Sequence, residues 1–222
     1  MPVRYAAVTI DGPAGSGKST IARQVAERLG FVYLDTGALY RAAAIAVDDA
    51  GVDPSDGDAC AQVARHAGIE LQRGRVSIRG RDVTQAIRSH HISSLSSRIA
   101  VHPQVREALL SLQRSFREKS PLVAEGRDTG SVVFPDADAK IYIDASTEER
   151  ARRRHEELAE KGSDISYEKV LEDLKERDQR DASRDIAPLV VPEHAVVVDT
   201  THLGIDEVVS QVMEVIQEKL AD

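Results

Sequence analysis

Residues Gly12–Ser19 read Gly-Pro-Ala-Gly-Ser-Gly-Lys-Ser and follow an apolar, β-branched run, Ala6–Ile10. The stretch matches the G-x-x-x-x-G-K-[ST] pattern at every fixed position. Between a strand and a helix this pattern forms a phosphate-binding loop, because glycine lets the backbone close until successive N–H groups face phosphate oxygens. The helix that follows adds the partial positive charge of its N-terminus. The sequence therefore predicts a nucleotide-phosphate site in a strand, loop and helix unit.

Two side chains of this loop carry chemistry. In the phosphate-loop geometry Lys18 reaches the β- and γ-phosphates of a nucleotide, and the Ser19 hydroxyl can ligate Mg²⁺. A glycine-rich turn alone would be weak support, since glycine also serves ordinary turns. The complete pattern between strand and helix is what indicates the site.

Four more short apolar runs follow the phosphate-loop unit. They barely alternate between apolar and polar residues, as expected of strands that helices cover on both faces. Helical patterns lie between them, which indicates an α/β fold with a five-stranded, mainly parallel sheet flanked by helices. The runs are 31–34, 122–124, 141–143 and 195–198, and the helical patterns are about 18–29, 37–50, 57–67, 104–118, 147–161, 167–182 and 205–220.

One stretch interrupts this order of strands and helices. Residues 69–72 and 75–80 flank Arg73-Gly74 and read as an antiparallel hairpin, with residues 82–84 as a candidate third strand. The sequence predicts a small antiparallel β insert beside the main sheet.

Composition limits the class of protein. The 222 residues suffice for one substantial core with a small insert, and the net charge of −8 argues against a general nucleic-acid binder. The single cysteine, Cys60, excludes an intrachain disulfide framework and a cysteine-rich zinc site, and it fits a reducing compartment. The chain enters its first strand within a few residues, and no run approaches the roughly 18 apolar residues of a membrane span. We therefore expect a cytoplasmic protein without a membrane or nucleic-acid partner.

Charged residues follow two of the predicted strands. Arg41 comes shortly after the strand 31–34, and Arg127 and Asp128 come directly after the strand 122–124 and its glycine. Ligands of doubly wound sheets bind beyond the carboxyl ends of the strands. Arg127 is thus a candidate clamp for an anion and Asp128 a candidate hydrogen-bond acceptor. The alternative is a surface salt bridge between these two loop residues.

The helix predicted over 147–161 begins with a capping box, in which Ser146 and Glu149 exchange hydrogen bonds with backbone donors. Three of its arginines share one face by the ~100° step of a helix, while Arg152 points away. That face is a candidate lid over phosphates, and the alternative is a solvated face neutralised by neighbouring glutamates. The three arginines are Arg150, Arg153 and Arg154.

The inward stripe of the next helix is apolar at first and then charged. Charges aimed at a core are costly unless they meet partners or a ligand, so we predict that the stripe lines a cleft. The alternatives are an internal ion-pair network and a helix that ends before Arg184. The stripe runs through Tyr167, Val170 and Leu174 and continues at the same spacing through Arg177, Asp181 and Arg184.

These arginines favour a phosphate over a hydroxyl as the group that accepts a phosphoryl group. A hydroxyl acceptor needs a carboxylate to take its proton, whereas a phosphate, with a second pKa of about 6, is already ionised. A phosphate acceptor needs arginines that hold it against the repulsion of a second anion, and Arg41, Arg127 and the charged stripe supply them. The pattern favours a nucleoside monophosphate kinase over a sugar or shikimate-type kinase.

Four segments together resemble the bacterial cytidylate kinases. Residues 10–19 contain the phosphate loop, which many proteins share. The other three, in this order, are specific to the family, and the resemblance extends over about residues 8–220. Those three are Asp35-Thr36-Gly37-Ala38-Leu39-Tyr40-Arg41, Glu125-Gly126-Arg127-Asp128-Thr129-Gly130-Ser131-Val132-Val133-Phe134-Pro135 and Lys175-Glu176-Arg177-Asp178-Gln179-Arg180-Asp181.

The resemblance implies one domain over residues 1–222 with the P-loop kinase fold, a small antiparallel β insert and a helical lid. Its activity would be transfer of the γ-phosphoryl group of ATP to CMP or dCMP in pyrimidine nucleotide metabolism, with Mg²⁺, by a monomer. Its core would span about 1–35, 104–146 and 186–222, its monophosphate-binding region about 36–103, its lid about 147–166, and a helix with nucleotide contacts about 167–185.

The resemblance also implies roles for single residues. Lys18, Arg127 and Arg153 would be catalytic, and Ser19 would ligate Mg²⁺. ATP would contact Gly12, Pro13, Ala14, Gly15, Ser16, Gly17, Lys18, Ser19 and Thr20. CMP would contact Thr36, Arg41, Ser97, Arg106, Arg127, Asp128, Arg177, Asp181 and Arg184, with Arg41 and Arg127 on its phosphate, Ser97, Arg106 and Asp128 on cytosine and Asp181 on ribose.

Alternatives remain open for some of these residues and for the activity. Ser97 lies in a serine run that also suits a helix cap, Arg106 alone resembles a surface arginine, and Asp185 is placed to pair with Arg184. The other candidate enzyme is a kinase for another small acceptor, such as UMP or AMP. A nucleotide-dependent switch without a small-molecule acceptor is the candidate from a different class.

Overall fold

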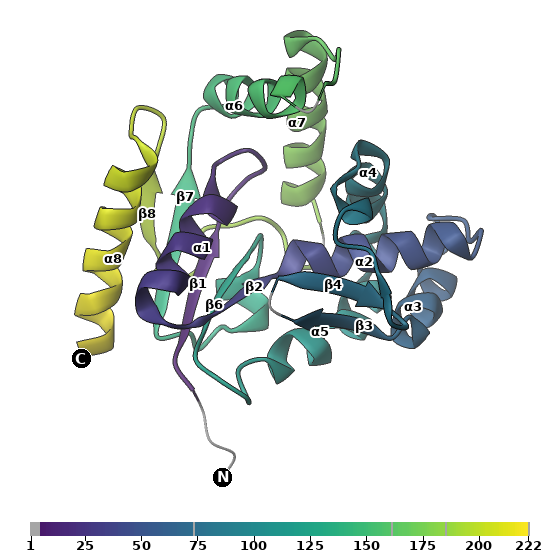
Figure 1. Cartoon of the computed structure of the whole chain (residues 1–222), viewed down its shortest axis with the longest axis horizontal. Helices are drawn as coiled ribbons and strands as arrows, with labels where there is room; N and C mark the ends of the chain where they lie inside the picture. Colours follow the sequence, from purple (N-terminus) through teal and green to yellow (C-terminus); the bar gives the residue numbers. More distant parts are fainter. Residues whose placement is uncertain (1–4, 73, 161, 185, 222) are drawn as a thin grey trace. The chain divides into compact units, whose positions relative to one another are not determined.

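The computed structural model describes residues 5–72, 74–160, 162–184 and 186–221. The chain divides into two compact units, residues 1–34 with 119–222 and residues 35–118 (Figure 1). Five parallel strands belong to the first unit, apart from the last residue of one strand, and three short antiparallel strands belong to the second. The predicted division into core, monophosphate-binding region and lid stays a prediction.

The larger sheet has the strand order β2-β6-β1-β7-β8. β1 pairs in parallel with β6 and β7, and β7 pairs in parallel with β8, so the predicted parallel sheet is confirmed. The strands are β1 (Ala7–Asp11), β2 (Val32–Asp35), β6 (Leu122–Gly126), β7 (Ala139–Asp144) and β8 (Val196–Asp199).

Two helices cover one face of this sheet and lie side by side (Figure 1). They are α1 (Lys18–Leu29) and α8 (Ile205–Ala221). Ile21 and Val25 of α1 meet Val212 and Ile216 of α8 in a core that continues into the strands. Because these side chains are buried, α1 is held on the sheet, and its first residue directly follows Gly17 of the phosphate loop.

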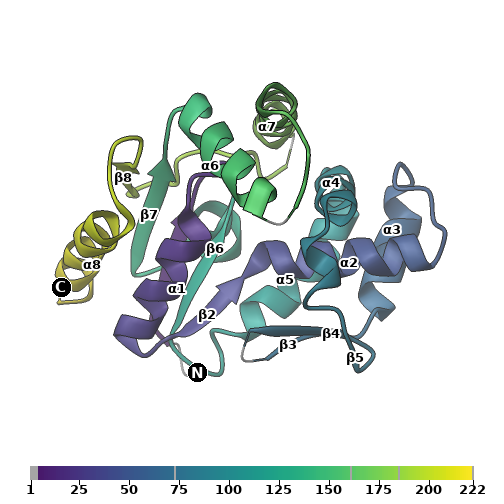
Figure 2. The same cartoon turned by 45° about the horizontal axis from the view of Figure 1, so that its top comes forward.

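The helices α6 (Thr147–Glu160) and α7 (Tyr167–Ala182) pack on each other in the same unit (Figure 2). Their small core includes Ala151, Val170 and Leu174, and it also takes in Ala14 of the phosphate loop. The two helices are thereby anchored on the loop itself. A short π-helical turn, η2 (Thr129–Val133), follows β6.

The second unit holds the predicted insert. β3 (Ile69–Gln72) and β4 (Arg75–Ile78) form the expected hairpin. The third strand, β5 (Arg81–Asp82), begins one residue earlier than the sequence indicates, because Arg79 and Gly80 form a tight turn after β4. The helices around this sheet are α2 (Thr36–Asp49), α3 (Gly57–His66), η1 (Ala86–Arg88), α4 (His90–Ile99) and α5 (Pro103–Ser115).

Helix α4 is absent from the sequence-based prediction. It spans the serine-rich run, and serine is a weak helix former because its hydroxyl competes for backbone groups. Tertiary packing overrides this preference, since Ile92, Leu95 and Ile99 are buried on one side of the helix. Ser89 caps its start by accepting a hydrogen bond from the N–H of Ile92 at 3.3 Å. Along the described residues, no helix is both long and apolar enough to cross a membrane.

Candidate active site

The phosphate loop follows β1 and passes very close to β7. A Cβ atom on Gly12 would lie 2.0 Å from the carbonyl oxygen of Ile143, so only glycine fits there. Gly17, with φ of 86°, is the residue before α1, and its carbonyl accepts the N–H groups of Thr20 and Ile21. The loop therefore opens directly into the helix N-terminus, as the pattern predicts.

Lys18 and Ser19 lie in the first turn of α1. The Lys18 side chain is buried against the loop, and its Nζ donates to the carbonyl oxygen of Pro13 at 3.1 Å. The Ser19 side chain is half-buried. The Ser16 hydroxyl is buried without a hydrogen-bond partner in the described part of the chain. Buried polar groups are normally satisfied, so an unsatisfied one inside the loop points to a ligand.

Asp11, the last residue of β1, ties the phosphate loop to the turn after β6. One carboxylate oxygen accepts the Thr129 N–H at 2.9 Å and the Thr129 hydroxyl at 2.7 Å, and the other accepts the Gly130 N–H at 2.7 Å. Asp11 is fully buried, and this desolvation raises its pKa from 3.8 to about 6 although the three hydrogen bonds oppose the rise. The carboxylate thus holds together two segments that carry predicted site residues.

The raised pKa of Asp11 predicts a specific pH dependence of stability. Because the folded state holds this proton up to about pH 6 and the unfolded state releases it near 3.8, ionisation of Asp11 destabilises the fold as pH rises through this range. The difference corresponds to about 3 kcal/mol. Urea unfolding from pH 4 to 7 is expected to show wild type losing about this much relative to Asp11→Asn. Parallel pH profiles of the two proteins would contradict the prediction.

Arg127 follows β6 and is held from two sides. Its Nη1 donates to the carbonyl oxygens of Gly12 at 2.9 Å and Gly126 at 3.2 Å, while its Nε donates to Asp181 of α7 at 3.0 Å. The guanidinium is therefore fixed beside the phosphate loop. Asp128, the next residue, is 6% exposed, so the alternative of a surface salt bridge between Arg127 and Asp128 is wrong.

Asp181 is the centre of a cluster of arginines. Its carboxylate forms ion pairs with Arg127, with Arg184 and, at 3.9 Å, with Arg177. Burial opposes ionisation of Asp181, but the three arginines outweigh it and hold the pKa below its usual value. The charged stripe forms an internal ion-pair network, which is one of the two alternatives to a cleft lining. Helix α7 ends at Ala182, before Arg184, as the other alternative states. Asp185 lies outside the described residues.

The arginines of α6 have three different environments. Arg150 is buried and donates to the loop carbonyl of Ala14 at 3.1 Å and to Asp178 of α7. Arg153 donates to Thr200 and approaches the Ser16 carbonyl at 3.5 Å. Arg154, like Arg152, pairs with a glutamate of its own helix. Arg150 and Arg153 thus contact the phosphate loop.

The capping box at the start of α6 is only half formed. The Ser146 hydroxyl accepts the N–H of Glu149 at 3.2 Å, as predicted. The N–H of Ser146, however, donates to Thr201, and the Glu149 carboxylate is taken by Arg152 and Arg153. Two guanidinium partners outcompete one backbone N–H, because charge-assisted hydrogen bonds are the stronger ones. The expected reciprocal bond from Ser146 to Glu149 is therefore wrong.

In the unit 35–118, Asp35 holds Arg41. The Asp35 carboxylate caps α2 by accepting the Ala38 N–H at 2.8 Å, and its other oxygen accepts Nη2 of Arg41 at 2.8 Å. The Arg41 Nε is buried without a partner in the described part of the chain, which leaves a donor for a ligand. Thr36, the first residue of α2, is buried.

Ser97 and Arg106 belong to the same unit, on α4 and α5. The Ser97 hydroxyl is buried and lacks a hydrogen-bond partner among the residues described. Arg106 is 8% exposed, donates to the carbonyl oxygen of Ala100 at 3.2 Å and lies 5.4 Å above the ring of Tyr40. Ser97 lies inside α4 and Arg106 is buried, so the readings as a helix cap and a surface arginine are wrong.

Sequence reasoning assigned no role to Asp11 or Asp35. Both end a strand, and both accept backbone N–H groups from the start of a helical segment, Asp35 from the helix that follows it and Asp11 from η2 after β6. An aspartate placed directly before a predicted helix is a recognisable N-cap signal, and it would have identified Asp35. Asp11 has no such signal, since its partners at 129 and 130 are far away in the sequence.

Comparisons with known proteins agree with this geometry. A family model described as cytidylate kinase matches residues 8–218. A cytidylate kinase of Shewanella loihica is 46% identical, with 100% of this chain and 99% of that protein covered, and one of Cupriavidus necator is 48% identical, with 93% of each covered. The solved structure of a gluconokinase from Sinorhizobium meliloti has a TM-score of 0.52 at 16% identity, with 97% of this chain and 94% of that chain covered, which shows a shared kinase fold alone. Since the family model and the relatives match almost the whole chain, it belongs to the cytidylate kinase family.

Proposed function

We propose that this protein transfers the γ-phosphoryl group of ATP to CMP or dCMP and forms CDP or dCDP and ADP. The observation that carries the proposal is the fixed guanidinium of Arg127, which is bonded to Gly12 at the start of the phosphate loop and to Asp181. A cation held beside a triphosphate site suits a second phosphate that must approach the first. Transfer is direct and reversible, with no covalent intermediate on the protein.

Electrostatic stabilisation supplies most of the catalysis in this proposal. Lys18, already directed into the loop by Pro13, neutralises charge on the β- and γ-phosphates. Arg127 holds the acceptor phosphate and lowers the repulsion between the two anions. Arg153 contributes from α6, where it already approaches the loop carbonyl of Ser16. The residues proposed to surround ATP are Gly12, Pro13, Ala14, Gly15, Ser16, Gly17, Lys18, Ser19 and Thr20.

The residues of the loop fit a Mg²⁺ ion that arrives with ATP. Mg²⁺ prefers oxygen ligands and keeps several of its waters, so it needs few ligands from the protein. The half-buried Ser19 hydroxyl at the start of α1 is a suitable single ligand, and phosphate oxygens and water complete the set. When bound, the ion withdraws charge from the transferring group.

The residues proposed to contact CMP are those that the resemblance assigns to it. Arg41, whose buried Nε has no partner among the described residues, and Arg127 bind the phosphate. Ser97, whose hydroxyl is likewise unsatisfied within the described part of the chain, Arg106 and Asp128 face the base. Thr36, Arg177, Asp181 and Arg184 complete the set, with Asp181 on the ribose.

Asp128 is proposed to distinguish cytosine from uracil. A carboxylate accepts a hydrogen bond from the N4 amino group of cytosine, whereas O4 of uracil would meet it acceptor to acceptor. Unpaired buried acceptors cost about 1–3 kcal/mol, which corresponds to roughly 10- to 100-fold discrimination.

Asp128→Ala is therefore expected to weaken CMP binding and to lower the ratio of kcat/KM for CMP over UMP by about 10- to 100-fold. Steady-state kinetics with both nucleotides at saturating ATP measure this ratio. Asp136→Ala, an exposed aspartate beyond the same turn, is the matched control and is expected to keep the wild-type preference. An unchanged preference in Asp128→Ala would remove its role in base recognition.

A coupled ADP-release assay with separate acceptors tests the function as a whole. CMP and dCMP are expected to stimulate ADP release far more than UMP, AMP, GMP or shikimate. If UMP or AMP stimulates ADP release most, the protein is a kinase for that nucleotide and not for CMP. If no acceptor stimulates ADP release, the result favours a nucleotide-dependent switch. We further propose that the protein is a cytoplasmic monomer, and that its partners are nucleotides and not a membrane or nucleic acid.

A further inference from the structure

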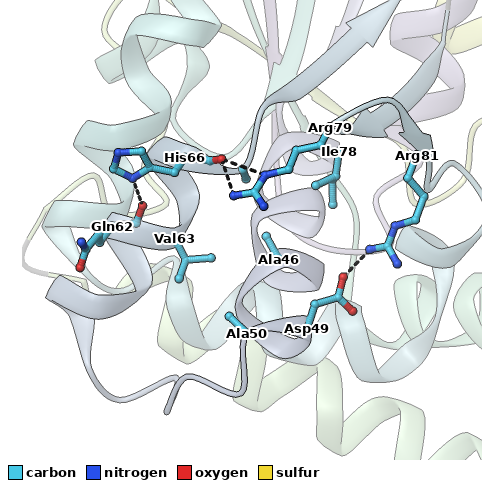
Figure 3. A pocket seen from close by; sticks show the side chains of 10 residues that line it. Ala46, Asp49, Ala50, Gln62, Val63, His66, Ile78, Arg79 and Arg81 are labelled. Atoms are coloured by element: carbon cyan, nitrogen blue, oxygen red, sulfur yellow. Dashed lines mark hydrogen bonds and ion pairs between the residues drawn. The ribbon is translucent and has the colours of Figure 1, made fainter.

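A cavity lies within the unit 35–118 (Figure 3). Its volume is about 640 Å³, within the range of small-molecule sites, about 300–1,000 Å³. It is open to one side and is lined by helix α2, helix α3 and the segment from the end of β4 to the start of β5. Ala46, Ala50, Val63 and Ile78 supply its apolar side chains. It contains none of the residues proposed for ATP or CMP.

Two arginines give this cavity a positive charge. Arg79 and Arg81 line it together with one acid, Asp49, so the ionised side chains sum to one positive charge when His66 is neutral. Apolar side chains beside a small number of charged groups are typical of ligand sites. The complementary molecule is a monoanion with a compact apolar body.

Arg79 occupies a strained backbone conformation. Its φ is 48°, in the left-handed region that glycine or asparagine normally occupies in such turns. The guanidinium is nevertheless held in place, because Nε and Nη2 both donate to the carbonyl oxygen of His66, at 3.3 and 3.1 Å. The remaining Nη1 has no acceptor in the described part of the chain. An arginine at a position that suits glycine points to a role for its side chain.

Arg81 can exchange its present partner for a ligand with little loss of stability. It pairs with Asp49, but the two side chains are 58% and 53% exposed. Exposed ion pairs contribute little to stability, so a bound carboxylate can replace Asp49 as the partner of Arg81. Figure 3 shows Arg79 directed at the carbonyl oxygen of His66 and Arg81 directed at the carboxylate of Asp49.

We propose that this cavity, which we name the insert pocket, binds a small organic carboxylate with a compact apolar body. The carboxylate contacts Arg79 and Arg81, and the apolar body packs on Ala46, Ala50 and Val63. Because only two arginines line the cavity among the residues described, one carboxylate satisfies their donors, whereas a polyphosphate would leave most of its oxygens unpaired. The site is independent of the proposed phosphoryl transfer.

Titration with naphthoate, followed by NMR of the backbone amides, tests the proposal. The full chain is first saturated with CMP and ADP, so that anion sites for nucleotides are occupied. Naphthoate is expected to cause saturable shifts at residues 46–50, 62–67 and 78–81. Naphthalenemethanol, which lacks the charge, and acetate, which lacks the ring system, are each expected to bind at least about tenfold more weakly than naphthoate.

Arg79→Gly is the decisive variant, since glycine accepts the positive φ without strain and the turn is retained. It is expected to weaken naphthoate binding about tenfold or more. Ala50→Leu, at an exposed position, fills the pocket without changing its charge and is expected to weaken binding as well. Arg75→Ala, an exposed arginine of β4 that does not line the pocket, is the matched control with wild-type affinity. Wild-type affinity in Arg79→Gly, equal binding of the neutral analogue, or unsaturable shifts spread over the surface would overturn the proposal.

Discussion

Arg127→Ala is expected to lower kcat/KM for CMP by about 10³-fold or more, the range reported for arginines that stabilise phosphoryl transfer. The Kd for ATP is expected to change by less than about twofold, since Lys18 and the loop amides hold the donor. The reason is the position of this guanidinium, bonded to Gly12 on one side and Asp181 on the other.

Two measurements separate this effect from a general loss of structure. Steady-state kinetics give kcat and KM for CMP, and equilibrium titration gives the Kd for ATP. Arg28→Ala removes an exposed arginine from the far end of α1 and is expected to behave as wild type. An equal loss of ATP affinity in Arg127→Ala would argue against a role toward the acceptor phosphate.

Arg127→Lys refines the same prediction. Lysine keeps the positive charge but lacks the planar fork that contacts Gly12 and Asp181 together. Its kcat/KM for CMP is expected to lie between those of wild type and Arg127→Ala. A full recovery by lysine would mean that charge alone, without the two-sided contact, accounts for the effect.

Asp181→Ala is expected to lower the free energy of unfolding by about 3–5 kcal/mol, the cost of breaking a buried ion pair by removing one partner. Asp181 is 1% exposed, and the side chains of Arg184 and Arg127 are 5% and 16% exposed. Without the carboxylate, these guanidinium groups remain in a poorly hydrated place with uncompensated charge. Urea unfolding monitored by circular dichroism at neutral pH measures the loss.

The matched control for Asp181 is Glu172→Ala on the same helix. Glu172 pairs with Lys169 at 2.8 Å, but the two side chains are 61% and 53% exposed. Water screens such a pair, so the expected loss is below about 1 kcal/mol. Similar losses in the two variants would contradict the central position of Asp181 in the cluster.

The pKa of Asp181 sets the pH range of its contribution. Because the arginines hold this pKa below its usual value of 3.8, the stabilisation is complete above that value. It is lost only as pH falls through the lower pKa of the folded state. Asp11 behaves in the opposite way, since burial raises its pKa and the fold loses stability as pH rises from about 3.8 to about 6.

Helices and strands were predictable wherever local pattern and tertiary packing agree. The helix after the phosphate loop was predicted at 18–29 and spans Lys18–Leu29, because its apolar spacing matches the face that packs on the sheet. Helix α4 was missed, since its serines disfavour a helix locally and only its packed Ile92, Leu95 and Ile99 stabilise one.

The residues of the candidate site also differ in how far the sequence alone could identify them. The phosphate loop is a contiguous pattern whose geometry depends on neighbouring residues, so Lys18 and Ser19 were identified from sequence alone. Arg41, Arg127 and Asp181 were candidates from their places after predicted strands or on the charged stripe, and the resemblance gave them specific roles. Ser97 and Arg106 were assigned by resemblance alone, because nothing local distinguishes a ligand-binding side chain from an exposed one. That Arg106 is buried, and that Arg127 bonds to Asp181, are facts of the tertiary structure.

The sequence by itself determined the phosphate loop, the α/β order of elements and the membership of a kinase family, because each depends on residues close together in the chain or on motifs in a fixed order. Only the tertiary structure decided which charges meet. Asp11 reaches residues 129 and 130, Arg127 reaches Asp181, and Arg79 with Arg81 lines a pocket against Asp49. Such contacts join segments distant in sequence, and their energies depend on burial and distance, which residue order does not specify.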